Sequence, residues 1–366
     1  MSHNFRKKRV TNTLTQDRKF GTDGIRGPVD TTMNPLFVTK LGWAAGSVLK
    51  EEGISRVLIG KDTRISGYML ESALQAGFIS AGMDVTLLGP LPTPAVAYLA
   101  KKYNQAGVVI SASHNLFEDN GIKFFTKDGH KFSFDLEQRI ELKITQLIST
   151  VKSIKLGKAN RLNDAQQQYV EFCKSSTPSL DLSNVSILLD CANGATYSVA
   201  PKVFRDLGAN VKTIGADPDG ININQNCGST SPEYIREEVL KASYDLGISF
   251  DGDGDRLLLV SKTGNILDGD DFKLIWINDA AKAANWIGDS SKFEGKTISS
   301  LLNEETGFQI NEILKKTREN SRSVTRRDFE IVQQSGTVRT VDLTITFSEK
   351  KNMIFIEAVN IDNLNK

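Results

Sequence analysis

The stretch Asp245-Leu-Gly-Ile-Ser-Phe-Asp-Gly-Asp-Gly-Asp-Arg256 joins a short apolar run to a loop of alternating aspartates and glycines. Residues 245–250 have the length and composition of a buried strand, and Asp251–Arg256, which we call the acidic loop, follows directly. A second stretch has the same order: 106–111 predicts a buried strand, and small polar residues follow in Ser111–Asn115, which we call the serine loop. Strands that run straight into polar loops are typical of α/β domains, where ligands bind beyond the carboxyl ends of the strands.

Strand and helix patterns also alternate upstream of the serine loop. Short apolar runs predict buried strands at residues 56–60 and 84–89. Helical spacing follows each run, over 68–81 and 93–103, and Pro94 falls in the first turn of the second helix, where proline is tolerated. This order predicts an α/β domain.

The same order recurs before the acidic loop. Strands are predicted at 185–190 and 210–215, and helices at 196–207 and 232–241, the last with Ser231 as a candidate N-cap. Two strand–helix–strand–helix–strand units predict tandem α/β domains with mixed, mainly parallel sheets.

The pattern weakens after the acidic loop. Residues 257–260 predict a strand and 271–284 a helix, whereas 285–325 are polar and poorly periodic. Strand character returns at 338–347 and 353–359. We therefore expect a short α/β fragment followed by a small C-terminal α+β segment.

Composition narrows the classes of protein. With 39% apolar and 24% charged residues, the 366-residue chain has ordinary globular usage, and its formal net charge of +1 favours neither nucleic acid nor a membrane as partner. Cys173, Cys191 and Cys227 match no metal or disulfide spacing, which favours reduced thiols and a cytoplasmic location. No apolar run approaches the ~18 residues of a membrane span. Residues 1–18 lack the apolar segment of a secretory signal and are interpreted as a disordered tail.

The acidic loop predicts a metal site. Asp251, Asp253 and Asp255 would repel one another without a cation, and the intervening glycines permit the tight path that turns them inward. All-oxygen ligands suit Mg²⁺. A calcium loop of EF-hand type is excluded because its sixth and twelfth positions hold Arg256 and Lys262. A solvated acidic turn is less favoured, since apolar runs flank the loop.

The serine loop predicts a reactive hydroxyl. Ser113 beside His114 could suggest a hydrolase, but adjacency does not make a triad, and a G-x-S-x-G elbow is absent from the loop. A serine, the nearby Lys123 and a metal site fit phosphoryl transfer better. By itself, the loop is also compatible with a structural Ser-rich turn.

Two further loops carry arginines that suit anions. Phe20–Gly27 is rich in glycine and contains Arg26, which could grip phosphate or carboxylate. Arg64 lies in the polar stretch 61–67 at a strand end. An ordinary N-terminal turn and a solvated loop residue are the respective alternatives.

Together these segments resemble motifs of the α-D-phosphohexomutase superfamily, and within it of the bacterial phosphoglucosamine mutases. The resemblance covers about residues 19–285 in consistent order. The segments that carry it are Phe20–Gly27, Gly60–Arg64, Ile110–Asn115, Asp119–Phe125, Asp190–Gly194, Asp217–Gly220, Asn222–Asn224, Cys227–Thr230 and the acidic loop.

The resemblance implies phosphoryl transfer through a phosphorylated Ser113. The phosphoserine would donate to glucosamine 6-phosphate, and the resulting glucosamine 1,6-bisphosphate, which is also the primer, would reorient and return its other phosphate. The product, glucosamine 1-phosphate, would feed UDP-N-acetylglucosamine and peptidoglycan precursors. One Mg²⁺ per active site would be held by Ser113, Asp251, Asp253 and Asp255.

The resemblance also implies roles for the surrounding residues. Lys123 matches the family's candidate general acid/base, Arg26 would steady the phosphoryl group, and His114 would line it. Substrate or phosphate contacts are expected from Thr22, Arg64, Arg256, Ser335 and Thr337. A phosphosugar is the expected partner, and a homodimer is left open.

The chain departs from the family's pattern in its second half and at Leu116, where the family has proline. The sugar loop Gly-Glu-x-Ser-Gly-His is absent from the sequence, and Gln334–Arg339 only partly matches the closing Arg-x-Ser-Gly-Thr-Glu-Pro loop. Two alternatives stay open: a phosphomannomutase or phosphoglucomutase, and a truncated, non-catalytic relative that binds phosphosugar.

The patterns and the resemblance divide the chain into five expected segments. These are a disordered tail (1–18), domain I with the serine loop (19–155), domain II with the acidic loop (156–256), a remnant of domain III (257–290) and a C-terminal segment that resembles domain IV (291–366).

Overall fold

The computed structural model describes residues 20–21, 24–267, 304–320, 324–332, 338–348 and 353–360. The chain divides into two compact units, one ending at Ile266 and one beginning at Leu267, and each is described by itself. The expected tail at 1–18 and the expected helix at 271–284 lie outside the described residues.

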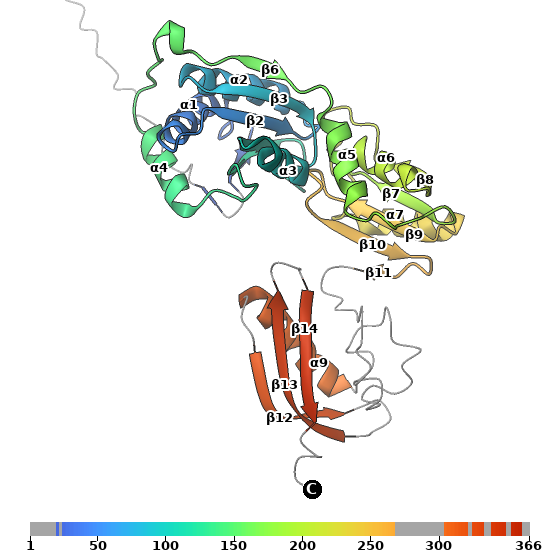
Figure 1. The fold of residues 1–366 in the computed structure, drawn as a ribbon. Helices are drawn as coiled ribbons and strands as arrows, with labels where there is room; N and C mark the ends of the chain where they lie inside the picture. Colours follow the sequence, from blue (N-terminus) through green and yellow to red (C-terminus); the bar gives the residue numbers. More distant parts are fainter. Residues whose placement is uncertain are drawn as a thin grey trace, which may run out of the picture. The chain divides into compact units, whose positions relative to one another are not determined.

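The first sheet is mixed and mainly parallel, as predicted (Figure 1). Its strands are β1 (Ile25–Pro28), β2 (Arg56–Lys61), β3 (Asp84–Pro90), β4 (Ala106–Ile110), β5 (Asp119–Phe125) and β6 (Ala159–Arg161). They lie in the order β1-β5-β4-β2-β3-β6. β4, β2, β3 and β6 run parallel, whereas β5 is antiparallel to its neighbours β1 and β4.

Helices cover both faces of this sheet. They are α1 (Pro35–Glu51), α2 (Ser66–Ser80), α3 (Thr93–Tyr103) and α4 (Phe134–Ile144). A 3-10 turn η1 (Ser153–Lys155) follows, and then α5 (Ala165–Ser175), which packs against α3 and against the helix at Val199–Asp206. Because side chains alternate along a strand, Val57 and Ile59 of β2 share a core with α1, α2 and α4, whereas Leu58 shares one with α3 and α5. Burial on both faces explains the continuous apolar run of β2.

Helix α3 begins and ends at the predicted residues. Thr93 and Pro94 form its first turn, and Asn104, with φ 52°, ends it in the left-handed conformation. The N–H of Thr93 donates to the backbone oxygen of Asp253 at 2.8 Å. The start of α3 therefore touches the acidic loop.

A second mixed sheet follows. Its strands are β7 (Ser186–Asp190), β8 (Asn210–Ile214), β9 (Leu246–Phe250), β10 (Leu257–Ser261) and β11 (Ile266–Leu267), in the order β11-β10-β9-β7-β8. β8, β7 and β9 are parallel, and β10 is antiparallel to β9. Its helices are α6 (Val199–Asp206) and α7 (Pro232–Ala242). They cover opposite faces, since Leu189 shares a core with α6 and Leu188 with α7.

The sheets do not follow the expected segment boundaries. β10 pairs with β9, and buried Val260 packs in the core beneath α7, so the second sheet continues past Arg256. Residues 257–267 thus belong to this sheet instead of starting a separate third fragment. β6 in turn pairs with β3 in the first sheet, although it lies in the segment 156–256.

The second unit contains a helix and an antiparallel sheet. They are α9 (Glu304–Asn320), β12 (Val324–Val332), β13 (Val338–Ser348) and β14 (Met353–Asn360), with the strands in the order β12-β13-β14. The predicted strands at 338–347 and 353–359 are confirmed, but α9 was not predicted. Its buried residues include Ile310 and Leu314 at helical spacing, while Thr306 and Thr317 fill other buried positions and weaken the apolar pattern.

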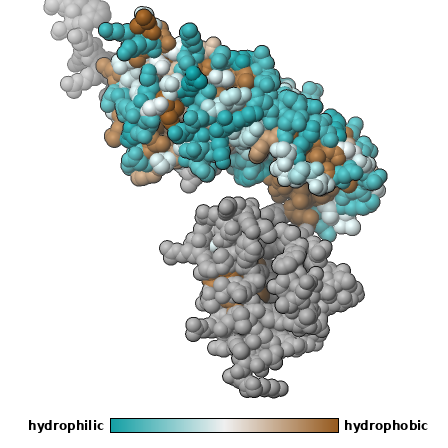
Figure 2. Space-filling view, viewed as in Figure 1, coloured by the Kyte–Doolittle hydropathy of each residue, from teal (hydrophilic) through white to brown (hydrophobic). Residues whose placement is uncertain are grey.

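The surface of the first unit is largely polar on the face shown in Figure 2. Cys173, Cys191 and Cys227 are free thiols, as expected. Within the described ranges, none of the helices has the length and apolar character needed to span a bilayer.

Candidate active site

Ser113 lies directly beyond the carboxyl end of β4 in an unusual backbone conformation. Its φ of 54° is in the left-handed region, which costs free energy for a residue other than glycine. Its N–H donates to Ser111 Oγ at 2.9 Å, and its own Oγ donates to Asp251 Oδ2 at 2.6 Å. The structure thus brings together the serine loop and the acidic loop, which lie 138 residues apart at these positions.

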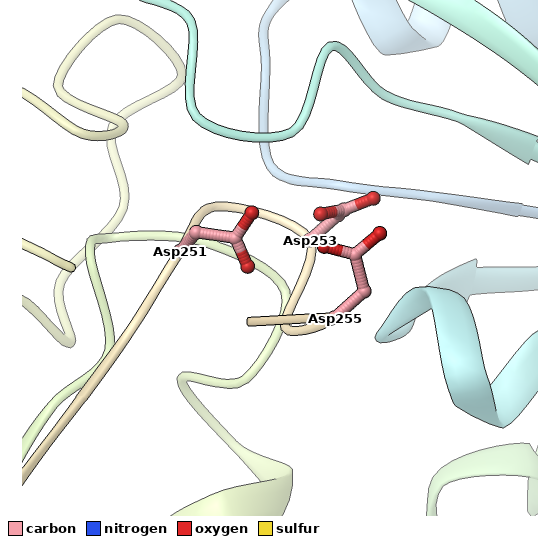
Figure 3. Close-up of side chains that lie close together, drawn as sticks. All are labelled: Asp251, Asp253 and Asp255. Atoms are coloured by element: carbon pink, nitrogen blue, oxygen red, sulfur yellow. The ribbon is translucent and has the colours of Figure 1, made fainter. Parts of the chain in front are cut away.

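The acidic loop gathers its three carboxylates. Oxygens of Asp251, Asp253 and Asp255 all lie within 4.8 Å of one another, and Figure 3 shows the side chains grouped along one loop. Asp251 and Asp253 are buried, whereas the side chain of Asp255 is 34% exposed. Burial and the neighbouring charge of Asp253 raise the pKa of Asp251 to about 6. The cluster therefore needs positive charge to remain fully ionised.

Lys123 supplies part of that charge from β5. Its Nζ donates to Asp253 Oδ2 at 2.6 Å and to Asp255 Oδ2 at 3.1 Å. Burial opposes the charge of Lys123, but the two carboxylates outweigh this effect and raise its pKa. Burial alone would raise the pKa of Asp253. The Lys123 ammonium has the opposite effect and holds this pKa below its usual range.

The cluster fits a divalent cation with hard oxygen ligands. Oδ1 of Asp253 is buried and has no hydrogen-bond partner among the described residues. A buried oxygen without a partner is costly unless a ligand meets it. Together with oxygens of Asp251 and Asp255, it offers part of a Mg²⁺ shell that water or phosphate oxygens would complete.

Positive groups border the hydroxyl of Ser113. One terminal nitrogen of Arg256 donates to Ser113 Oγ at 2.6 Å and also to Nδ1 of His114, and its Nε donates to Asp251 Oδ2 at 3.3 Å. Partial burial and the charges of Arg256 and Arg26 lower the pKa of His114, so its imidazole is neutral. This arrangement suits a group with phosphate oxygens.

Arg64 has a structural role in place of the predicted phosphate contact. Its side chain is fully buried and pairs with Asp62, whose Oδ2 accepts from Nε at 2.8 Å. Its remaining guanidinium N–H groups donate to the backbone oxygens of Ser113, Asn115, Leu116 and Asp119. Because Arg64 is buried and its guanidinium N–H groups all have acceptors, it supports the backbone of the serine loop and presents no free donor to a substrate.

The other predicted phosphate contacts are not tested. Thr22, Ser335 and Thr337 lie outside the described residues. Their roles stay predictions.

Comparison with known families accounts for both sheets of the first unit. Residues 17–150 match the phosphoglucomutase/phosphomannomutase α/β/α domain I, and residues 167–264 match domain II. The chain belongs to the phosphoglucomutase/phosphomannomutase family. The domain II match runs past Arg256, in agreement with the place of β10 in the second sheet.

Relatives in this family include bacterial phosphoglucosamine mutases. That of Legionella pneumophila (strain Corby) is 58% identical over 269 residues, which cover 73% of this chain and 59% of the relative. That of Yersinia enterocolitica serotype O:8 is 56% identical over 298 residues, which cover 80% of this chain and 65% of the relative. The chain thus spans about three fifths of the length of these curated relatives.

Solved structures of the family share the fold. A phosphoglucomutase/phosphomannomutase family protein from Burkholderia thailandensis matches with a TM-score of 0.62 at 23% identity, covering 90% of this chain and 72% of that one. The open form of the Paramecium phosphoglucomutase parafusin matches with a TM-score of 0.55 at 14% identity, covering 93% and 90%. At these identities the likeness concerns the fold alone.

Domains I and II also contribute supporting residues that the sequence analysis did not single out. Thr93 Oγ1 of domain I donates to Asp253 Oδ2 at 2.6 Å, and Ser111 Oγ donates to Asp62 Oδ2 at 2.6 Å. Asn224 of domain II donates to the backbone oxygen of Ser113 at 2.9 Å. A Thr-Pro pair at a helix start is a signal for the first contact. Ser111 and Asn224 lie in segments that carry the family resemblance, but the sequence does not show which atoms they contact.

Proposed function

We propose that this chain interconverts glucosamine 6-phosphate and glucosamine 1-phosphate through a phosphorylated Ser113. The observation that carries the proposal is the 2.6 Å hydrogen bond from Ser113 Oγ to Asp251 Oδ2, which joins the domain I hydroxyl to the domain II carboxylates. The choice of sugar is supported by the curated relatives at 58% and 56% identity, which are phosphoglucosamine mutases.

A Mg²⁺ ion is part of the proposal. Asp251, Asp253, Asp255 and the phosphate on Ser113 would hold it, and when bound it would offset negative charge on the transferred phosphoryl group. The partnerless Oδ1 of Asp253 supports this assignment.

The transfer balances between serine and sugar. The bond between Ser113 Oγ and phosphorus breaks, and a bond from phosphorus to the C1 hydroxyl oxygen of glucosamine 6-phosphate forms. One proton passes from that hydroxyl to Ser113 Oγ, and we assign its relay to Lys123 beside the acidic loop. After glucosamine 1,6-bisphosphate reorients, its 6-phosphoryl group returns to Ser113 by the same exchange in reverse.

The remaining residues orient the phosphoryl group. Arg256 already contacts Ser113 Oγ, and neutral His114 accepts from Arg256, which keeps the guanidinium turned toward the serine. Arg26 adds positive charge near His114. Fixed positive donors at this position would stabilise the charge that develops during transfer.

The proposal also includes a cytoplasmic location and a role for the product in precursor synthesis. A cytoplasmic enzyme of this kind would supply glucosamine 1-phosphate for UDP-N-acetylglucosamine and peptidoglycan precursors. The free thiols of Cys173, Cys191 and Cys227 are compatible with a reducing compartment.

Glucose and mannose phosphates are the alternative substrates. The domain I and domain II models that match this chain describe phosphoglucomutase and phosphomannomutase. The serine and acidic loops alone do not distinguish among the three sugars, because the proposed contacts of these loops are with the phosphoryl group and not with the sugar.

A coupled assay tests the proposal. The chain is incubated with glucosamine, mannose or glucose 6-phosphate, Mg²⁺ and a bisphosphate primer. Turnover that prefers glucosamine 6-phosphate supports the proposal, and preference for another sugar supports the alternative. An inactive but folded and phosphorylated protein would instead indicate a phosphosugar-binding relative without mutase activity.

A further inference from the structure

Asn224 links domain II to the serine loop of domain I. Its side chain is buried, and its Nδ2 donates to the backbone oxygens of Ser113 and Asn115, both at 2.9 Å. The same two oxygens accept from Arg64 of domain I, at 3.0 and 2.7 Å. Each carbonyl is therefore held from both domains at once.

The position of Asn224 is itself fixed. Its φ of 58° is left-handed, a conformation that asparagine tolerates better than most residues, and its N–H donates to the backbone oxygen of Ala192 at 2.9 Å. The acidic loop packs directly on the contact: a Cβ added at Gly252 would lie 2.6 Å from the Ser113 oxygen and 2.7 Å from Asn224 Nδ2. Only glycine permits this approach, so the three segments meet at one point.

We propose that Asn224 is a positioning residue for phosphoryl transfer at Ser113, an inference that rests on the proposed function. The left-handed backbone of Ser113 costs free energy and persists because its surroundings hold it. By fixing the carbonyl groups of Ser113 and Asn115, Asn224 keeps Ser113 Oγ aimed at Asp251. It acts through the backbone and has no role in the chemistry itself.

Two substitutions separate the side chain from the backbone. Asn224→Gly removes both hydrogen bonds but still adopts a left-handed φ without strain. Asn224→Asp keeps the shape and replaces the donor by a carboxylate that faces two carbonyl oxygens, so its effect is expected to be larger. Asn226→Gly is the matched control, because Asn226 lies in the same loop with φ 54° and is exposed.

Two measurements on the full chain test the proposal. The first is the rate at which glucosamine 1,6-bisphosphate with Mg²⁺ phosphorylates Ser113, followed by peptide mass spectrometry. The second is amide hydrogen exchange in peptides that cover the serine loop. We expect Asn224→Gly to slow phosphorylation by about 10- to 100-fold and to speed exchange in the loop. We expect Asn224→Asp to have a larger effect than Asn224→Gly on both the phosphorylation rate and the exchange rate. We expect Asn226→Gly to change neither rate.

The outcomes decide the proposal separately from the proposed function. Unchanged exchange in both Asn224 variants overturns it, and so does faster exchange with an unchanged phosphorylation rate. If the unsubstituted chain is not phosphorylated, the proposed function fails, and the exchange comparison still decides whether Asn224 holds the loop. If Asn224→Gly does not fold, the same readouts on Asn224→Asp apply.

Discussion

At the residue scale, the three aspartates of the acidic loop occupy different environments. Asp251 accepts from Ser113 and Arg256, whereas Asp253 accepts from Lys123 and Thr93. Asp255 is partly exposed and shares the Lys123 ammonium. The Lys123 ammonium therefore offsets part of the negative charge at Asp253 and Asp255.

Replacing one of these carboxylates should remove metal-dependent stability. Mg²⁺ at a hundredfold excess over its Kd would stabilise the chain by about 2.7 kcal/mol, which raises Tm. Asp253→Asn deletes a buried ligand charge, so the rise in Tm should disappear in thermal unfolding with and without Mg²⁺. Asp128→Asn, on an exposed turn, should retain the full rise. An undiminished rise in Asp253→Asn would argue against the proposed metal site.

A second expectation at this scale concerns the buried pair of Arg64 and Asp62. Both side chains are 0% exposed, so Arg64→Leu leaves the Asp62 carboxylate buried without its partner. The free energy of unfolding should fall by about 3–5 kcal/mol in denaturant titration.

Arg139→Leu is the control for that experiment. Arg139 pairs with Glu51 and Glu52 at the surface, where solvent screens the charges, so its loss should lower the free energy of unfolding far less than the loss of Arg64. Equal losses in the two variants would contradict the supporting role of Arg64.

At the element scale, the strand ends position the site. β4 and β9 each lead into a polar loop at the carboxyl end of the parallel strands of their sheet, and α3 begins against the loop that follows β9. The apolar runs of the strands made both loops predictable. The hydrogen bonds from Arg64 to the serine loop were not predictable. An arginine in a polar loop looks the same in sequence whether it binds an anion or pairs with a buried aspartate.

Asp245 offers a pH-dependent test of the second sheet. It joins the starts of β7 and β9, since its Oδ2 accepts from the hydroxyl and N–H of Ser186, and its Oδ1 accepts from Lys262. These partners hold the pKa of Asp245 below its ordinary 3.8. The folded state therefore gains stability above that pH and loses it as pH falls toward the lower, folded pKa.

Asp245→Asn should consequently lower the free energy of unfolding at neutral pH. Below about pH 4, the free energy of unfolding should decrease less steeply with falling pH in this variant than in the unsubstituted chain. Denaturant titrations of both forms across this pH range measure the difference. A difference between the two forms that does not shrink on acidification would show that the carboxylate charge is not what joins the strands.

At the scale of the whole molecule, the two α/β domains were largely predictable and the second half was not. The central strands β2, β4 and β7 are buried on both faces, which produces continuous apolar runs, whereas the exposed strand β6 has no such run. The expected end of domain II at Arg256 was wrong, because β10 lies beyond the acidic loop and pairs antiparallel with β9. The polar acidic loop had been interpreted as the end of the domain. α9 escaped prediction because threonines occupy part of its buried face.

The boundary makes a testable difference. A fragment of residues 19–267 contains both sheets and should fold, with cooperative unfolding and a Mg²⁺-dependent rise in Tm. A fragment of residues 19–256 lacks β10, which exposes one edge of β9 and removes Val260 from the core beneath α7. It should be clearly less stable by thermal unfolding. Equal stability of the two fragments would contradict the assignment of β10 to domain II.

The most direct measurement is the site of phosphorylation. The chain is incubated with glucosamine 1,6-bisphosphate and Mg²⁺, digested and mapped by mass spectrometry. We predict one phosphoryl group on Ser113 and none on Ser111, whose hydroxyl donates to buried Asp62, and we predict that Ser113→Ala folds but takes up no phosphate. Phosphate on another residue, or equal labelling of Ser113→Ala, would contradict the account.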